Sequence, residues 1–168
     1  MVTNFHELYQ KYAQDIYRFA YWLCGNAQDA EDITSETFVH ALTATAKIKA
    51  ETVKGYLLTI AKNLAYKKSN REKRFVPLNA DLEQQMNGPA HTVENSDSLQ
   101  IALRFIQTLP VVDRAALVLR LQDDLSYEEI AGVLNISIAA AKVKVHRARL
   151  KLNEYMHQQE EPQNENHS

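Results

Sequence analysis

The stretch LSYEEIAGVLNISIAAAKVKVHRARLKL, residues 125–152, contains two helical patterns with almost nothing between them. Ser126 and Glu129 have the spacing of a capping box, in which each side chain bonds the backbone at the start of a helix. Asn135 tolerates the left-handed backbone conformation of a sharp turn, and Ser137 can cap the helix that follows. The stretch therefore predicts a helix-turn-helix.

The second of these helices has one apolar face and one basic face. Its expected buried stripe consists of Ile138, Ala141, Val145, Ala148 and Leu152. Residues 137–152 hold five Lys and Arg side chains and no acidic residue. A helix with this distribution is suited to the major groove of DNA. A plain helical hairpin is the alternative, and the two caps together with the basic run favour the DNA-binding interpretation.

The composition describes a globular chain of 168 residues and 19.2 kDa, enough for one ordinary domain or two small ones. Cys24 is the single cysteine, so no intramolecular disulfide can form, which fits a reducing compartment. The N-terminal segment has no basic stretch followed by an apolar run, and no apolar stretch approaches membrane-spanning length. We therefore expect a soluble, cytoplasmic protein without membrane insertion.

The charge distribution says more than the net charge of -2. Residues 47–74 contain nine basic and two acidic residues, and residues 137–152 form the second basic segment. Two basic segments in an otherwise acidic chain indicate two surfaces that contact phosphates. The competing interpretation is that Lys-rich segments are merely solvated helix faces, and one such segment alone would favour it.

Helical periodicity dominates the chain, and we expect an all-α fold of two small helical domains joined by a flexible linker. The expected boundaries are residues 1–74 for the first domain, 75–97 for the linker, 98–156 for the second domain and 157–168 for a disordered tail. The linker has two prolines, an Asn-Gly pair and no period of 3.6. The core positions expected in the second and third helices are Ile33, Thr37, Phe38, Ala41, Leu42, Val53, Leu57, Ile60 and Leu64.

Signs of catalysis and of bound cofactors are missing from the sequence. The histidines and Cys24 have no metal-ligand spacing, and there is no Gly-rich phosphate loop or nucleophile–base pairing. Cys24 lies beside Trp22 and Leu23 at an expected helix end, which is typical of a packed, inert cysteine. We expect no enzyme, no metal and no cofactor.

Three segments resemble the extracytoplasmic-function (ECF) sigma factors of RNA polymerase. LPVVDRAALVLRLQDDLSYEEIAGVLNIS, followed by HRARLKL, is similar to region 4 of that family, which lies near the -35 element. FHELYQKYAQDIYRFAYWLCGNAQDAEDITSETFVHAL resembles regions 2.1–2.2, and GYLLTIAKNLAYKK resembles regions 2.3–2.4. The resemblance covers about residues 5–156 in the family's order. It implies a factor that binds core RNA polymerase and directs promoter-specific initiation.

The resemblance also implies partners. Asp29, Asp32 and Glu36 match the acidic helix that docks on the polymerase clamp helices in this family, although Ser35 stands where the family usually has Gln. The polymerase flap, promoter DNA and an anti-sigma factor are the other implied partners.

Six residues match the helix that engages the -10 element and its separated strands: Lys62, Asn63, Tyr66, Lys67, Lys68 and Arg71. Asn63 can read a base edge, Tyr66 can stack on an unpaired base, and the cations can follow phosphates. The segment from Thr43 to Glu51 occupies the position of the family's base-capturing loop. Tyr56, Lys67 and Asn70 replace the Trp, Asp and Arg that are common in the family, so the -10 preference cannot be transferred.

The implied -35 contacts are Ser137, Ala139, Ala140, Lys142, Val143, Lys144, His146 and Arg147. Ala139 and Ala140 replace the usual Gly-Thr pair, and Val143 replaces a common Ser. Apolar side chains can touch a thymine methyl but make no hydrogen bonds to base edges. Arg147 and Lys142 must therefore supply most of the hydrogen-bonded reading, and DNA shape supplies the rest.

Two other functions compete with the sigma-factor interpretation. An operator-binding regulator that acts without polymerase would need a self-complementary dimer surface, and it leaves the acidic segment DAEDITSE unexplained. A helical interaction protein would use the acidic face but leaves both basic segments unexplained.

Overall fold

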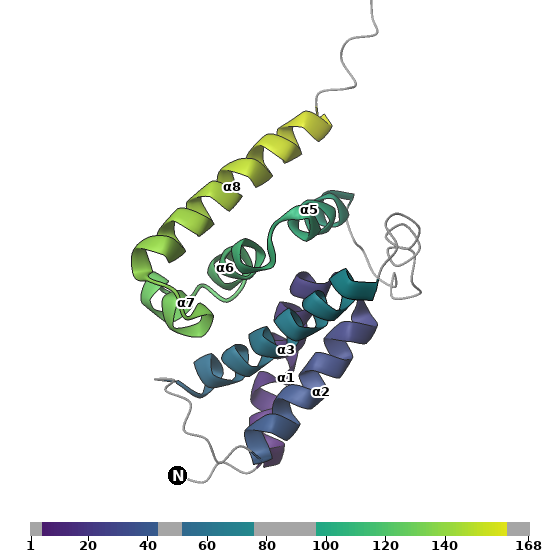
Figure 1. Ribbon diagram of the computed structural model, residues 1–168, viewed down its shortest axis with the longest axis vertical. Helices are drawn as coiled ribbons and strands as arrows, with labels where there is room; N and C mark the ends of the chain where they lie inside the picture. Colours follow the sequence, from purple (N-terminus) through teal and green to yellow (C-terminus); the bar gives the residue numbers. More distant parts are fainter. Residues whose placement is uncertain (1–4, 44–51, 76–96, 161–168) are drawn as a thin grey trace, which may run out of the picture.

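The structure is a computed structural model that describes residues 5–43, 52–75 and 97–160, and it describes side chains for residues 5–43, 52–71 and 97–159. Every element in these ranges is an α-helix (Figure 1). The helices are α1 Phe5–Cys24, α2 Ala27–Thr43, α3 Val53–Phe75, α5 Asp97–Thr108, α6 Val111–Leu121, α7 Tyr127–Leu134 and α8 Ile138–Glu160. The all-α expectation is confirmed. The expected linker and base-capturing loop lie almost wholly outside the described residues.

Helices α1, α2 and α3 pack against one another as an N-terminal bundle. Gly25 ends α1 with a φ of 80°, a conformation that glycine adopts without strain. The side chain of Asn26 then accepts a hydrogen bond from the backbone N–H of Asp29 at 2.8 Å, which caps α2. Leu42 and Val53 were expected in the core, and that was wrong, since they are 57% and 46% exposed beside the undescribed segment 44–51.

Helices α5 to α8 form a C-terminal bundle that contains the predicted helix-turn-helix. Ser126 and Glu129 make both bonds of the capping box, and Asn135 adopts the left-handed conformation with φ 55° and ψ 50°. The Ser137 hydroxyl accepts from the backbone N–H of Ala140 at 3.0 Å, which caps α8. The buried stripe of α8 is confirmed at Ala141, Val145 and Ala148.

Both ends of α8 differ from what the sequence predicted, the first in its exposure and the last in its position. Ile138, the first residue of α8, was predicted to be buried but is 42% exposed. At the other end α8 continues to Glu160, four residues past the expected domain boundary, and Tyr155 packs on Phe105 with ring centroids 5.1 Å apart.

The two bundles lie against each other (Figure 1). Helix α1 contacts α5 and α6, while α3 contacts α6 and α7. The buried apolar side chains of both bundles form one continuous cluster, from Ile16 in α1 to Ala148 in α8. The sequence predicted two domains but did not predict that they share a core.

Within the described ranges, no helix combines the length and the apolar character needed to cross a membrane.

Candidate nucleic-acid interface

The outward face of α8 presents most of the residues that were predicted to contact the -35 element. Ser137, Ala139, Lys142, Val143, His146 and Arg147 are exposed, and Ala140 is half-buried. Val143 is 44% exposed, which excludes packing beneath the preceding helix. The structure thus brings these side chains together on one solvent-facing surface.

Two cations beside this face, Lys142 and Arg120, contact the same aromatic ring, that of Tyr127. The Lys142 ammonium lies 5.9 Å from the centroid of the Tyr127 ring, and the Arg120 guanidinium lies 4.6 Å from the same centroid. Arg120 also donates a hydrogen bond to the carbonyl oxygen of Leu125 at 2.8 Å. Cation–π contacts of this kind hold long side chains in place without neutralising them. Sequence reasoning missed Arg120 and Tyr127 here, although a Tyr directly after an N-cap was an available signal.

Lys144 differs from the other cations of α8, because it points toward α6. Its ammonium lies 2.8 Å from Asp113 Oδ1, and both side chains are partly buried. A phosphate at this position would have to compete with Asp113.

Helix α3 carries the residues that were predicted to contact the -10 element, and the structure divides them between different surfaces. Asn63, Lys67 and Arg71 are exposed and are spaced four residues apart, so they form one stripe along α3. A stripe with an amide and two cations can contact bases and phosphates in the structure as it stands.

Lys62 and Tyr66 lie on a different face of α3, the face toward the C-terminal bundle. Lys62 is only 6% exposed, and burial lowers the pKa of its ammonium. Burial, with a smaller contribution from the Asp113 carboxylate, raises the pKa of Tyr66 to about 12. The Lys62 ammonium lies 5.5 Å from the Tyr66 ring centroid, and the buried Tyr66 hydroxyl has no hydrogen-bond partner.

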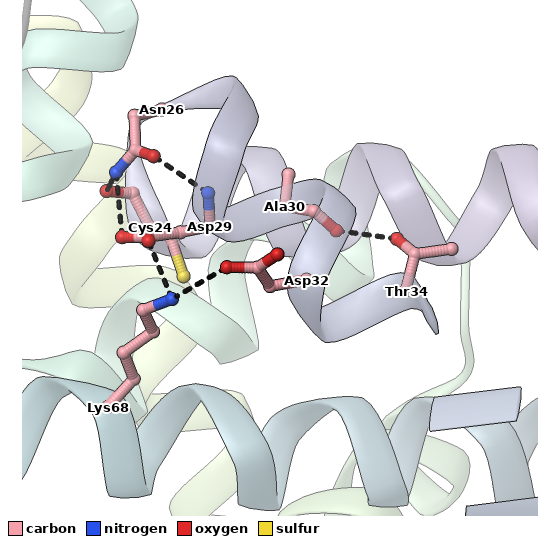
Figure 2. A network of polar contacts seen from close by, with 7 residues as sticks. All are labelled: Cys24, Asn26, Asp29, Ala30, Asp32, Thr34 and Lys68. Carbon is pink, nitrogen blue, oxygen red and sulfur yellow. Dashed lines mark hydrogen bonds and ion pairs between the residues drawn. The ribbon is translucent and has the colours of Figure 1, made fainter. Parts of the chain in front are cut away.

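Lys68 joins α3 to the acidic start of α2, as Figure 2 shows. Its ammonium lies 2.6 Å from Asp29 Oδ1 and 3.6 Å from Asp32 Oδ2. Partial burial disfavours the charged form, but the hydrogen bond to Asp29 and the charges of both carboxylates outweigh it, so the pKa of Lys68 is raised. Asn26 donates to Asp29 Oδ2 at 2.8 Å, so both oxygens of Asp29 are already engaged.

Two of the three predicted docking carboxylates are exposed on the outer face of α2, although one of them, Asp32, also pairs with Lys68. The Asp32 side chain is 59% exposed, and Glu36 is exposed as well. A shallow groove of about 280 Å³ lies between α1 and α2 and is lined by residues that include Tyr9, Tyr17 and Glu31. This groove offers aromatic walls beside a carboxylate, and the sequence pattern did not single it out.

No cluster of His, Cys, Asp or Glu side chains that could hold a metal ion occurs among the described residues.

Comparisons with known proteins agree for both bundles. Residues 8–75 match the family model for sigma-70 region 2, and residues 99–152 match the model for sigma-70 region 4. The chain is 32% identical over 151 residues to the ECF RNA polymerase sigma factor SigM of Bacillus subtilis, across 87% of this chain and 91% of that one. It is 33% identical over 164 residues to the ECF sigma factor SigE of Mycolicibacterium smegmatis, across 92% of this chain and 62% of that longer relative.

A solved structure resembles both bundles together. The sigma factor RpoE of Bartonella quintana, crystallised with the anti-sigma factor NepR, superposes with a TM-score of 0.72 at 22% identity, across 93% of this chain and 98% of that one. At this identity the likeness shows the fold.

Proposed function

This chain belongs to the ECF family of RNA polymerase sigma factors and directs promoter recognition by the polymerase, and we propose how its residues divide that work. A sigma factor is a non-enzymatic polymerase subunit, so its residues act by binding. We assign core docking and -10 recognition to residues 1–74, -35 recognition to residues 98–156, and the connection to residues 75–97.

The -35 element is read by the exposed face of α8. The observation that carries this assignment is the set of outward side chains from Ala139 to Arg147 on a doubly capped helix-turn-helix. Arg147 and Lys142 donate to base edges or phosphates, and Val143 contacts an apolar base edge. The cation–π contact with the Tyr127 ring positions the Lys142 ammonium.

The -10 element is engaged by α3 in two ways. The exposed stripe of Asn63, Lys67 and Arg71 is available for the first contacts with DNA. Lys62 and Tyr66 supply a cation and a stacking surface for a separated strand, since base stacking on an aromatic ring tolerates any base.

Core polymerase docks on α2 through Asp32 and Glu36. Both carboxylates are exposed, whereas Asp29 is engaged by Lys68 and Asn26. We therefore propose that Asp29 acts mainly as a positioning residue, which holds α2 against α3 and keeps the docking face in place. The clamp helices of the polymerase are the partner for this face, and the polymerase flap is the partner for the C-terminal bundle.

An anti-sigma factor is a further proposed partner, supported by the complex in which the Bartonella quintana relative was crystallised. Because core polymerase and promoter DNA are cytoplasmic in bacteria, we place the protein in the cytoplasm.

The test of the assignment combines core binding with charge reversal at the docking face. Purified protein should co-elute with core polymerase in gel filtration and give it promoter-specific run-off transcription on genomic fragments. We expect Asp32→Lys to weaken core binding about tenfold or more, because it places a cation where a basic partner should dock. Glu7→Lys, at an exposed site near the start of α1 and outside the proposed docking residues, is the matched charge reversal and should leave core affinity unchanged.

Circular dichroism of both variants excludes unfolding as the cause. Equal core affinity of Asp32→Lys and wild type would remove this face of α2 from the interface.

A further inference from the structure

We infer that the groove between α1 and α2 binds an arginine side chain of the core polymerase, which stacks on the Tyr9 and Tyr17 rings and pairs with Glu31. This inference rests on the proposed docking of the polymerase on α2. It adds a contact on α1 to a docking face that is otherwise assigned to Asp32 and Glu36 alone.

Small side chains from both helices leave the groove open. Ala13 lies between Tyr9 and Tyr17 at four-residue steps along α1, so the three side chains share one face of that helix. Thr34 and Ser35 line the groove from α2. The hollow of about 280 Å³ is smaller than typical small-molecule pockets. It therefore suits one long side chain better than a whole ligand.

The two aromatic walls of the groove are held in place by neighbouring rings. The Tyr9 ring packs edge-on against the buried Phe38 ring, with centroids 5.0 Å apart. The Tyr17 ring stacks on that of Tyr21, with centroids 6.3 Å apart and planes inclined by 21°. Tyr9 nevertheless remains 44% exposed. Because both rings are already positioned, a partner side chain would lose little free energy in ordering them.

The groove carries negative charge that no neighbouring cation neutralises. Glu31 is exposed, and among the described side chains no cation lies within ion-pair distance of it. Burial, with smaller contributions from the charge of Glu31 and from Tyr21, raises the pKa of Tyr17. Arg18, the cation next to Tyr17 in the sequence, pairs with Asp15 instead. The Glu31 carboxylate is therefore available to a partner.

Arginine is the side chain that matches both the rings and the carboxylate. Its planar guanidinium stacks on aromatic faces and donates hydrogen bonds to a carboxylate at the same time. A lysine ammonium is compact and strongly hydrated, so it uses the flat walls less well. An apolar side chain would bring the Glu31 carboxylate into an interface without a partner, which is unfavourable.

The groove is continuous with the proposed docking face of α2. Glu31 and Ser35 of the groove directly precede Asp32 and Glu36 in the sequence, and all four side chains are exposed. A partner that contacts Asp32 and Glu36 therefore covers the groove as well. The three carboxylates call for the same basic partner, which is why we assign the arginine to the polymerase.

The first experiment measures the affinity of the full-length protein for core polymerase by fluorescence anisotropy. Glu31→Gln keeps the shape of the side chain and removes its charge, and it should weaken binding about fivefold. Tyr17→Leu removes an aromatic wall and should weaken binding about threefold. Glu7→Gln is the matched neutralisation, because Glu7 is exposed on α1 and does not line the groove. It should bind as wild type does.

The second experiment fills the hollow. Ala13→Leu should exclude the arginine and weaken core binding about tenfold, because the stacking and the ion pair are lost together. The double variant Ala13→Leu/Glu31→Gln should then bind no more weakly than Ala13→Leu alone. An additional loss in the double variant would mean that Glu31 acts outside the groove, which would overturn the inference.

Circular dichroism and thermal unfolding show whether Ala13→Leu remains folded. If it does not, the double variant Tyr17→Leu/Glu31→Gln takes its place. Two contacts with one arginine should give a combined loss that differs from the sum of the single losses. Strict additivity would contradict a shared partner side chain.

A cross-link identifies the side chain that enters the groove. Photoactivated p-benzoylphenylalanine, placed at Tyr9 on the rim, should capture a core polymerase peptide that contains arginine. Capture of a peptide without arginine would overturn the inference, as would unchanged core affinity of Glu31→Gln.

Asp32→Lys separates this inference from the docking assignment on which it rests. If Asp32→Lys weakens core binding and the groove variants do not, docking on α2 stands and the arginine contact is refuted. If neither Asp32→Lys nor the groove variants change the affinity, the docking assignment itself fails.

Discussion

Helices α8 and α3 both carry cations that we propose contact promoter DNA, but one set is exposed and the other is partly covered. The reading face of α8 is exposed from Ala139 to Arg147 and contributes nothing to the core. The face of α3 with Lys62 and Tyr66 is covered by the other bundle. Substitutions on the exposed face of α8 should therefore change DNA binding without changing stability, whereas substitutions on the covered face of α3 should change both.

Tyr66→Ala should have the largest effect on stability. Removal of a partly buried ring from the contact between the bundles should lower the free energy of unfolding by about 2–3 kcal/mol, as measured by urea denaturation. In polymerase complexes the same variant should impair strand opening more than initial promoter binding, as followed by permanganate reactivity of unpaired thymines.

Tyr66→Phe is the matched variant, because it keeps the ring and removes a hydroxyl that has no partner. It should be as stable as wild type or more stable by up to about 1 kcal/mol. Unchanged stability in Tyr66→Ala would show that the ring is exposed in solution, and the contrast with α8 would then disappear.

Arg147→Ala should give the next largest effect, and the effect should be confined to DNA. Loss of a bidentate base contact costs about 1–3 kcal/mol of promoter binding, and the exposed position predicts an unchanged melting temperature. Gel-shift titrations of the holoenzyme with promoter duplexes measure the first quantity. Gln158→Ala, exposed at the far end of α8, should change neither, and a drop in melting temperature for Arg147→Ala would place the side chain in the fold.

Lys144 is intermediate between the two faces, because it belongs to α8 but pairs with Asp113. Lys144→Ala should cost about 0.5–1 kcal/mol of stability, as expected for a partly exposed pair. It should also lower the salt dependence of -35 binding by about one unit if the ammonium moves to a phosphate.

Asp113→Asn separates these two effects, since it breaks the same pair and leaves the cation in place. It should reproduce the stability loss while keeping the salt dependence of wild type. If Lys144→Ala also keeps that dependence, Lys144 is purely structural.

Val143→Ser should have the smallest effect on affinity, less than about 0.5 kcal/mol. It should nevertheless change which -35 bases are preferred, because a hydroxyl can hydrogen-bond where an isopropyl group can only contact a methyl. Selection of bound sequences from a pool randomised at the -35 element compares the two proteins. Identical selected sequences would mean that Val143 reads nothing.

Local chemistry explains which features were predictable from the sequence. The caps at Ser126 and Ser137 and the left-handed turn at Asn135 depend on residues within four positions of each other, and all three were predicted correctly. The exposure of Val143 followed in the same way, from its position opposite the buried stripe of α8.

The covered face of α3 could not be predicted from the sequence. An amphipathic pattern distinguishes one apolar, buried face from one polar, solvent-facing face, and it does not reveal a second buried face. The apolar stripe of α3 indicates which side packs within the N-terminal bundle, and every other residue is then expected to face solvent. Lys62 and Tyr66 are polar, so nothing local shows that a segment some fifty residues away covers them. The ion pairs Lys68–Asp29 and Lys144–Asp113 could not be predicted either, because the two partners of each pair are distant in sequence.

The two ends of the long helix α8 differ in what they contact. Its first ten residues carry the exposed face that we propose reads the -35 element, while Tyr155, near its end, packs on Phe105. Mutations that alter the reading end therefore leave the anchoring end intact. Such an arrangement makes the preferred promoter easy to change during evolution, because a new binding preference can arise by single substitutions that the fold does not resist.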